Sequence, residues 1–407
     1  MPEKTIEVLL SPKFGDVRGF ASIGMAVGLK RSGKPDLGII FSERACSAAG
    51  VFTTSRMAAA PVDHDRAVLK KNSSGIRAVV VNSGHANAAT GAAGRALARL
   101  MSETAERSLQ VPPRSVLVCS TGIIGELPNI VILRRGIELA ARRLTAADRD
   151  FQKAILTTDK VEKVAGVKVR LAAGRSASIV GVAKGSGMIA PNMATMLAFI
   201  VTDAAVPPAA LRGMLRAAAA GTFNAVTVDG DTSTNDTVLA LANGMSGVGI
   251  SARARPIFFE GLRQVCERLA WKLAEDGEGA TKVVEVLVRG ARTARSAARA
   301  AKTVAESLLV KTAMHGEDPN VGRVLAALGR SGLKEVQADR IDVSFNGLRA
   351  VSRGVLDRTH PAPALKNALR PKQVRIEIDL HAGPGAGRSV TCDLSAEYVR
   401  INAEYHT

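Results

Sequence analysis

Residues 181–203, with the sequence GVAKGSGMIAPNMATMLAFIVTD, form the most informative segment of this 407-residue chain. A glycine-rich turn that includes Lys184 leads to Ala194 and Thr195, and an apolar run follows directly. The simplest interpretation is a loop that enters a buried strand, with Thr195 as a β-branched residue that starts it. The second interpretation is chemical, because the turn brings a hydroxyl next to the carbonyl that precedes it. Both interpretations predict a core strand after this turn.

The chemical interpretation makes Thr195 a nucleophile that is released by self-cleavage. Strain in the turn would press the Ala194 carbonyl against the Thr195 hydroxyl, so that an N-to-O acyl shift followed by hydrolysis frees the Thr195 amine. An α-amino group has an unperturbed pKa of roughly 7.7–8 and can accept the hydroxyl proton near neutral pH. Such a threonine needs no histidine, so no Ser-His-Asp arrangement is required.

A second segment, residues 119–125 (CSTGIIG), supplies candidate donors for the oxyanion of an acyl transfer. It resembles a strand that ends in a tight polar turn, where Gly122 allows the backbone to approach closely. The Thr121 hydroxyl and the Gly122 N–H are the candidate donors. An ordinary strand-to-helix turn has the same pattern, so only the combination with Thr195 supports catalysis.

Around these two segments the chain alternates between strand-like and helix-like stretches, which predicts an α/β or α+β fold. No flexible linker marks a domain boundary, so a break at Thr195 would be chemical. The expected strands include residues 37–41, 78–82, 116–119, 179–183, 341–345 and 374–380. The expected helices include residues 92–109, 131–144 and 209–220.

The composition is that of a globular protein, with 46% hydrophobic, 23% charged and only 3% aromatic residues. The N-terminus resembles neither a signal peptide nor a transit helix, and no apolar run reaches the length of a membrane span. We therefore expect a soluble cytoplasmic protein without a membrane partner. The four cysteines and six histidines show no metal-ligand spacing, so we expect no metal and reduced, buried thiols.

The formal net charge of +18 is the unusual global property. A basic chain can bind nucleic acid, and a nucleic-acid-binding protein is the non-enzymatic alternative. The charge is dispersed, however, and the few aromatic residues offer no platform for stacking bases. Its two local concentrations, Arg134 to Arg143 and Arg292 to Lys302, are interpreted as solvated helix faces, and no nucleic-acid partner is expected.

The chain resembles the ornithine acetyltransferase family, the dual-function glutamate N-acetyltransferases, nearly from end to end. Two departures are His85, where the family usually has Asn, and Val321, where it usually has Trp; GEDPNVGR itself has the alternative interpretation of a structural turn. The resemblance rests on ten ordered segments: RGFASIGMAVGLK (18–30), VFTTSRMAAAPV (51–62), VNSGHANAATG (81–91), STGIIGELP (120–128), TTD (157–159), KGSGMIAPNMATML (184–197), DGDTSTNDTV (229–238), DGEGATK (276–282), GEDPNVGR (316–323) and the terminal INAEYHT.

The resemblance implies a layered α/β fold of the self-cleaving, N-terminal-nucleophile-like type. It implies cleavage between Ala194 and Thr195 into an α chain of residues 1–194 and a β chain of residues 195–407, assembled as a heterotetramer of two α and two β chains. The oxyanion donors of the family correspond to Thr121 and Gly122. Its substrate contacts correspond to Thr158, Lys184, Thr195, Glu278, Asn402 and Thr407.

The implied activity is a ping-pong transfer of an acetyl group from N-acetylornithine to glutamate in arginine biosynthesis, through acetyl-Thr195. Lys184 is then expected to pair with a substrate carboxylate, and Glu278 with the ornithine side-chain ammonium. No metal or prosthetic group is required, and acetyl-CoA remains open as a second donor. The alternative enzyme class is an N-terminal-nucleophile amidohydrolase or aminopeptidase, which would pass the acyl group to water.

Overall fold

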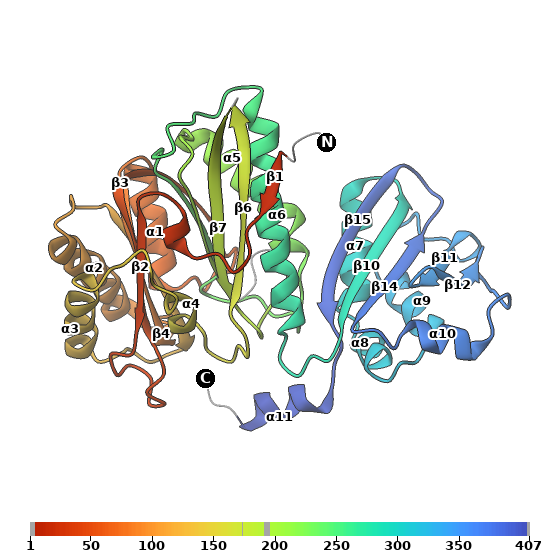
Figure 1. The fold of residues 1–407 in the computed structure, drawn as a ribbon. Coiled ribbons are helices and arrows are strands. Elements are labelled where there is room, and N and C mark those ends of the chain that lie inside the picture. The colour runs from red at the N-terminus through yellow and green to blue at the C-terminus, as the bar shows by residue number, and fades with distance from the viewer. Residues whose placement is uncertain (1–4, 173, 191–195, 405–407) are drawn as a thin grey trace.

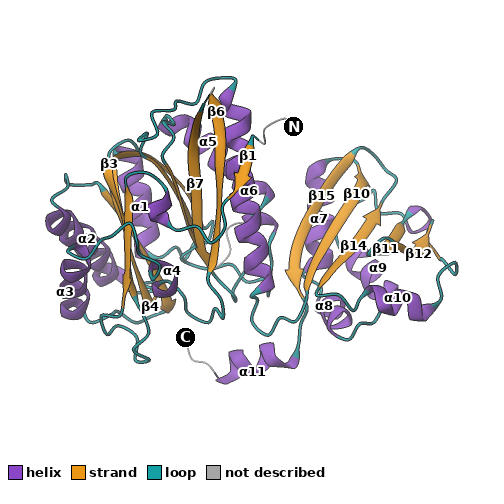
Figure 2. Ribbon diagram, viewed as in Figure 1, coloured by secondary structure: helices purple, strands orange, loops and turns teal. Residues whose placement is uncertain are grey.

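Two β-sheets organise the chain into two lobes, which Figure 1 shows next to each other. The computed structural model describes residues 5–172, 174–190 and 196–404. The first lobe extends through helix α6, which ends at Glu275, and the second starts with strand β10 at Val283. Helices cover the outer faces of the sheets, as Figure 2 shows.

Nine strands of the described residues form the sheet of the first lobe, in the order β1-β6-β7-β8-β9-β3-β4-β5, with β2 paired to β3. All six residues of β8 are buried, as expected for a strand covered on both faces. The strands are β1 (Ile6–Val8), β2 (Phe20–Met25), β3 (Leu37–Phe52), β4 (Ile76–His85), β5 (Val116–Ile123), β6 (Lys163–Ala172), β7 (Arg175–Lys184), β8 (Leu197–Thr202) and β9 (Thr237–Ala242).

The first lobe has four layers because its sheet folds over itself at the 16-residue strand β3. Side chains such as Phe199 on β8 and Val81 on β4 share one core between the two halves of the sheet. Phe258 of α6 packs on the outside of one half, and Met101 of α2 on the outside of the other. The helices are α1 (Ala60–Lys71), α2 (Gly91–Leu109), α3 (Ile130–Ala141), α4 (Phe151–Ala154), α5 (Pro208–Gly221) and α6 (Ala254–Glu275).

The second lobe contains a sheet with the order β13-β12-β11-β14-β10-β15 and its own hydrophobic core. Helix α11 (Ala396–Glu404) then leaves this lobe and runs back below the first one (Figure 1). The strands are β10 (Val283–Ala291), β11 (Asp342–Phe345), β12 (Leu348–Ser352), β13 (Val355–Leu356), β14 (Gln373–Asp379) and β15 (Gly385–Cys392). The other helices are α7 (Ala294–Ala305), α8 (Leu308–His315), α9 (Val321–Gly329) and α10 (Ala362–Ala368).

The structure confirms the layered α/β prediction. Each expected strand and helix lies on an element of the same type, although α3 ends at Ala141 and β8 begins only at Leu197. The boundary predicted between residues 194 and 195 falls between β7 and β8, two neighbouring strands of one sheet, so it does not separate the lobes. Whether the chain is cut there stays a prediction.

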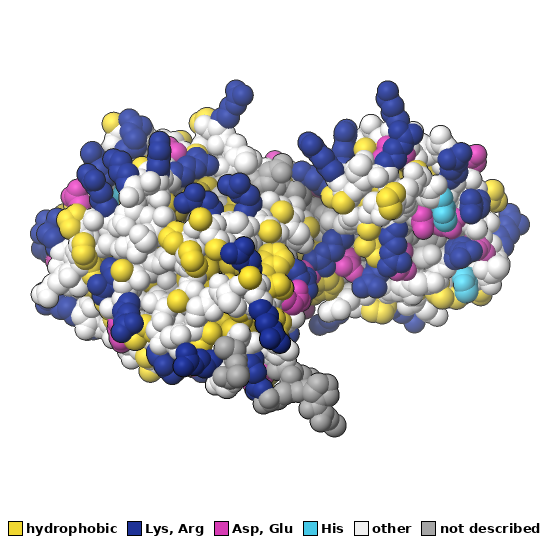
Figure 3. All heavy atoms as spheres, turned by 90° about the horizontal axis from the view of Figure 1, so that it is seen from above, with side chains coloured by type: hydrophobic (Ala, Val, Ile, Leu, Met, Phe, Trp, Pro, Cys, Tyr) yellow, Lys and Arg dark blue, Asp and Glu magenta, His cyan; other side chains and the backbone are white. Residues whose placement is uncertain are grey.

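The surface and the thiols agree with the sequence analysis. All four cysteines are free and buried. Figure 3 shows Lys and Arg side chains scattered over both lobes rather than gathered in one patch on the visible face. No helix in the part of the chain that the structure describes is long and apolar enough to cross a membrane.

Candidate active site

Six of the predicted site residues line one pocket of about 100 Å³. They come from segments that are far apart in the sequence: the end of β5, the turn after α4, the end of β7, the segment before β10 and helix α11. The predicted residues that lie outside the described part of the chain are Ala194, Thr195 and Thr407. The predicted residues that meet in the pocket are Thr121, Gly122, Thr158, Lys184, Glu278 and Asn402.

The oxyanion candidates lie at the end of β5, where this strand runs parallel to β4. Gly122 has a φ of +126°, and a Cβ atom on it would lie 2.3 Å from the Gly84 carbonyl carbon. Only glycine therefore fits at this position. Asn235 fixes the neighbouring backbone, because its Nδ2 donates to the carbonyls of Ala86 at 2.6 Å and Ser120 at 2.8 Å.

Lys184 is buried beside this turn, and its ammonium group contacts hydroxyls. Its Nζ donates to Thr157 Oγ1 at 2.7 Å and to Thr121 Oγ1 at 3.2 Å, and lies 3.8 Å from Asp159 Oδ2. Burial lowers the pKa of Lys184, and the charge of Asp159 opposes this shift. Because Thr121 Oγ1 accepts from Lys184, its own hydrogen is available for a substrate oxygen.

A buried ionic cluster that sequence reasoning missed connects three segments of the site. Lys163 is fully buried, and its Nζ lies 2.7 Å from Asp159 Oδ1 and 2.5 Å from Asp276 Oδ2. Asp159 also accepts from the Gly185 N–H at 2.6 Å. Burial would raise the pKa of Asp159, but the charges of Lys184 and Lys163 hold it well below its usual range. Asp159 and Asp276 stand in the TTD and DGEGATK segments, but apart from the spacing of four between Asp159 and Lys163 nothing local indicates that these groups pair.

Glu278 is the acidic group of the pocket. Its backbone N–H donates to the Ser186 carbonyl at 2.8 Å, and its Oε2 accepts from Asn402 Nδ2 at 2.9 Å. Ser186 Oγ is in turn hydrogen-bonded to Thr158 Oγ1 at 2.7 Å. Within the described residues Glu278 forms no ion pair, although its charge acts to raise the pKa of the nearby Lys184, so it can accept a substrate ammonium group.

Helix α11 is held against this acidic group by the segment that precedes β10. Gly279 has a φ of +71°, and a Cβ atom there would lie 2.4 Å from the Tyr398 nitrogen. Ser395 Oγ donates to the Gly279 carbonyl at 2.6 Å. The close contact positions Asn402, in the last turn of α11, next to Glu278.

The chain that follows Thr195 is fixed by Asp236, a second group that sequence reasoning missed. Asp236 Oδ1 accepts from the Met196 N–H at 3.1 Å, and Thr237 N donates to the Met196 carbonyl at 3.0 Å. Asp236 Oδ2 is buried and has no hydrogen-bond partner among the described residues. Burial raises the pKa of Asp236 well above its usual range. This carboxyl group therefore binds the residue that directly follows Thr195, next to the proposed cleavage point.

The two departures from the family pattern lie outside the pocket lining. His85 ends β4 and pairs with Thr121 and Ile123 of β5, while burial lowers its pKa. Val321 begins α9 in the second lobe, where the side chain of Asn320 caps the helix by accepting from Arg323 N at 3.1 Å. The GEDPNVGR segment is thus a helix start, which supports its structural interpretation.

Comparison with known proteins identifies the family of this chain. The arginine biosynthesis bifunctional protein ArgJ of Thermotoga neapolitana is 46% identical over 396 residues, which cover 96% of this chain and 99% of that protein. The ArgJ protein of Thermus thermophilus is 46% identical over 393 residues, which cover 96% of this chain and 98% of that protein. Among solved structures, an ArgJ protein from Bacillus halodurans has a TM-score of 0.49 and 39% identity, covering 51% of this chain and 98% of its own. An ornithine acetyltransferase from Mycobacterium tuberculosis, solved with ornithine, has a TM-score of 0.42 and 32% identity, and the match covers 46% of this chain and 98% of that chain. The model of the ArgJ family matches residues 21–407, and the chain belongs to this family.

Proposed function

We propose that this protein is a glutamate N-acetyltransferase of arginine biosynthesis that takes its acetyl group from N-acetylornithine. Thr195 carries the acetyl group after the chain is cut between Ala194 and Thr195. The names of the ArgJ relatives support the pathway, since they are arginine biosynthesis bifunctional proteins. The single observation that carries the proposal is that an oxyanion turn, a buried lysine and a carboxylate without an ion pair among the described residues line one pocket.

Maturation begins with attack of the Thr195 hydroxyl on the Ala194 carbonyl carbon. The C–N bond between the two residues breaks, the freed nitrogen takes the hydroxyl proton, and an ester joins Ala194 to Thr195. Water then hydrolyses this ester and leaves a C-terminal carboxylate on Ala194 and a free amine on Thr195. The new amine is the base that the nucleophile needs.

In the first half-reaction the Thr195 oxygen attacks the acetyl carbonyl of N-acetylornithine and its proton passes to the Thr195 amine. The Gly122 N–H and the Thr121 hydroxyl donate to the oxyanion. Ornithine leaves with the proton from the Thr195 ammonium group, and acetyl-Thr195 remains. In the second half-reaction the glutamate amine attacks this ester, N-acetylglutamate leaves, and the Thr195 hydroxyl is restored.

Glu278 and Asn402 are suited to the ammonium group of the ornithine side chain, because the carboxylate forms no ion pair among the described residues and its side-chain partner there is the Asn402 amide. The contacts of Lys184 with Thr121 and Thr157 favour a role in orienting the Thr121 hydroxyl. Replacing Lys184 by methionine separates the two roles. A lower kcat indicates orientation of Thr121, whereas a higher KM indicates contact with a substrate carboxylate.

The remaining features follow from the family resemblance. They are a heterotetramer of two α chains (1–194) and two β chains (195–407), a cytoplasmic location, the absence of a prosthetic group and optional use of acetyl-CoA. Thr407 is expected to contact the substrate together with Asn402. Sedimentation analysis of the purified protein tests the assembly.

The decisive assay supplies acetyl-labelled N-acetylornithine with and without glutamate. We expect one equivalent of ornithine per active site without glutamate, and steady turnover to N-acetylglutamate with it. Thr195→Ala should lose both, while Thr303→Ala, a matched change on α7 of the second lobe, should retain both. Release of free acetate at the same rate with and without glutamate would instead identify a hydrolase.

A further inference from the structure

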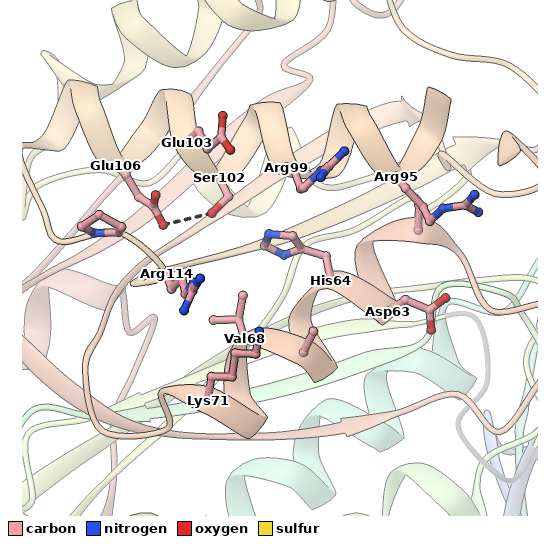
Figure 4. A pocket seen from close by; sticks show the side chains of 13 residues that line it. Asp63, His64, Val68, Lys71, Arg95, Arg99, Ser102, Glu103, Glu106 and Arg114 are labelled. Atoms are coloured by element: carbon pink, nitrogen blue, oxygen red, sulfur yellow. Dashed lines mark hydrogen bonds between the residues drawn. The ribbon is translucent and has the colours of Figure 1, made fainter. Parts of the chain in front are cut away.

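A second, larger cavity lies between α1 and α2, apart from the candidate active site. Its volume is about 610 Å³, and none of the residues that line it lines the active-site pocket. Figure 4 shows it between the two helices, with Arg114 of the loop before β5 near one end, and Pro113 of the same loop also lines it. A cavity of roughly 300–1,000 Å³ is the usual size of a small-molecule site.

Cationic side chains from three elements surround this cavity: Lys71 of α1, Arg95 and Arg99 of α2, and Arg114. Within the described part of the chain none of these four side chains forms an ion pair or a hydrogen bond. Arg95 and Arg99 are one turn apart on α2, where like charges repel each other and destabilise the helix. Arg99 is also one turn from Glu103 and yet does not pair with it. The cations are therefore free to bind a ligand.

Two of the three acidic groups of the lining already have partners. Asp63 Oδ1 lies 3.5 Å from Arg66 Nη1. Glu106 Oε1 accepts from Ser102 Oγ and from the Ser115 N–H, each at 3.2 Å. Among the residues that the structure describes, Glu103 alone of the three has no partner, so four free cations face one free carboxylate.

The rest of the lining is largely apolar and suits a ring system. Ala60, Ala67, Val68 and Pro113 contribute to the wall. His64 Nδ1 contacts Asp65 Oδ1 at 3.1 Å, and among the described residues Nε2 has no partner and can meet a ligand; Figure 4 shows the ring in the middle of the space between the helices. An apolar wall with several cations at its rim matches a molecule that has a flat body and more than one negative charge.

We propose that this cavity is a binding site for a phosphorylated small molecule of nucleotide size. Arginine forks and a lysine ammonium recognise phosphate oxygens well, and the apolar wall packs against the base. Two sources share this chemistry: the nucleotide end of a coenzyme A thioester donor and a free nucleotide that acts as an effector.

A neighbouring hollow adjoins the cavity on the side of Ala89. It shares Ala60, Asp63 and Arg95 with the cavity and is also lined by Ala89. The segment that contains Ala89 begins at Ala86, which lines the active-site pocket. The hollow thus extends the cavity to within three residues, along the chain, of the active-site lining.

Calorimetric titration of the purified protein with adenosine 3′,5′-bisphosphate tests the site without any assay of activity. We expect saturable binding to the wild type and at least a tenfold loss of affinity in Arg99→Ala/Arg114→Asn. Asparagine is chosen at position 114 because Arg114 has a φ of +62°, which asparagine tolerates better than alanine. Arg212→Ala on α5, away from the cavity lining, is the matched control and should bind like the wild type. Absence of saturable binding to the wild type, or equal affinity in the double variant, would overturn the proposal.

Activity assays then distinguish the sources. A donor site predicts that the double variant has a raised KM for acetyl-CoA and an unchanged KM for N-acetylornithine. An effector site predicts that the bisphosphate changes transfer from N-acetylornithine in the wild type and not in the variant. Because binding is measured directly, failure of the acetyltransferase proposal would leave the test of this site intact.

Discussion

Replacing Lys163 by methionine should destabilise the first lobe by about 3–5 kcal/mol, the usual cost of removing one partner from a buried ion pair. Lys163 has no exposed surface and lies between Asp159 at 2.7 Å and Asp276 at 2.5 Å. Without it, Asp276 would retain two backbone donors, the N–H groups of Lys160 at 3.0 Å and Val161 at 3.3 Å. Methionine has a similar volume, so the loss comes from the uncompensated charge rather than from a cavity.

The second variant, Lys163→Met/Asp276→Asn, tests this reasoning because it removes the stranded charge. Asp159 keeps Lys184 in both variants, so the double variant should recover more than half of the lost stability. Urea unfolding is followed by the fluorescence of Trp271, the sole tryptophan, which lies on α6 of the same lobe. Lys153→Met is the control, because this exposed lysine pairs with Asp150 on the surface and should cost at most about 1 kcal/mol. Equal midpoints for the Lys163 and Lys153 variants, or a double variant less stable than the single one, would refute the account.

Three further predictions concern other parts of the first lobe. Gly187→Ala would place a Cβ atom 2.4 Å from Glu278 Oε2 and so displace this carboxylate from the substrate ammonium group. Because the loss of one charged hydrogen bond costs roughly 1.5–3 kcal/mol, KM for N-acetylornithine should rise roughly tenfold or more. Gly213→Ala, in open space on α5, should leave KM unchanged and stabilise the helix by roughly 0.5–1 kcal/mol, and steady-state kinetics and thermal melts of the pair check both. Burial raises the pKa of Asp65 to about 6, so the native state binds a proton that the unfolded state releases above about pH 4. The stabilisation that this proton gives to the native state is present below pH 4 and is lost as the pH rises through 6. The loss amounts to about 3 kcal/mol, at about 1.36 kcal/mol per pKa unit. Thermal melts between pH 4 and 7 should show a weaker dependence of stability on pH in Asp65→Asn than in the wild type.

Local patterns in the sequence were sufficient for much of the fold and for part of the site. Apolar runs bounded by Gly and Ser predicted β4, β5 and β7, since each strand is decided by its own residues and by turns at its ends. Gly122 could be singled out because a strand that ends in a polar turn often needs a residue without a side chain. The structure gives the reason at this position, which is the close approach of Gly84.

Groups whose role depends on distant partners could not be predicted. Lys163 looks like an ordinary polar residue of a strand, and its second partner, Asp276, is 113 residues away. Asp236 stood inside a recognised polar segment, but only the fold reveals that it binds the Met196 N–H. The lobe boundary was also missed, because β8 and β9 complete the first sheet although they follow the predicted cleavage point.

Mass spectrometry of the denatured, purified protein shows whether one peptide bond is broken to create the nucleophile. We expect two polypeptides in the wild type, residues 1–194 and 195–407, with one acetyl group on the second after incubation with N-acetylornithine, and a single uncut chain in Thr195→Ala. A full-length wild-type chain that still transfers acetyl groups would contradict this expectation.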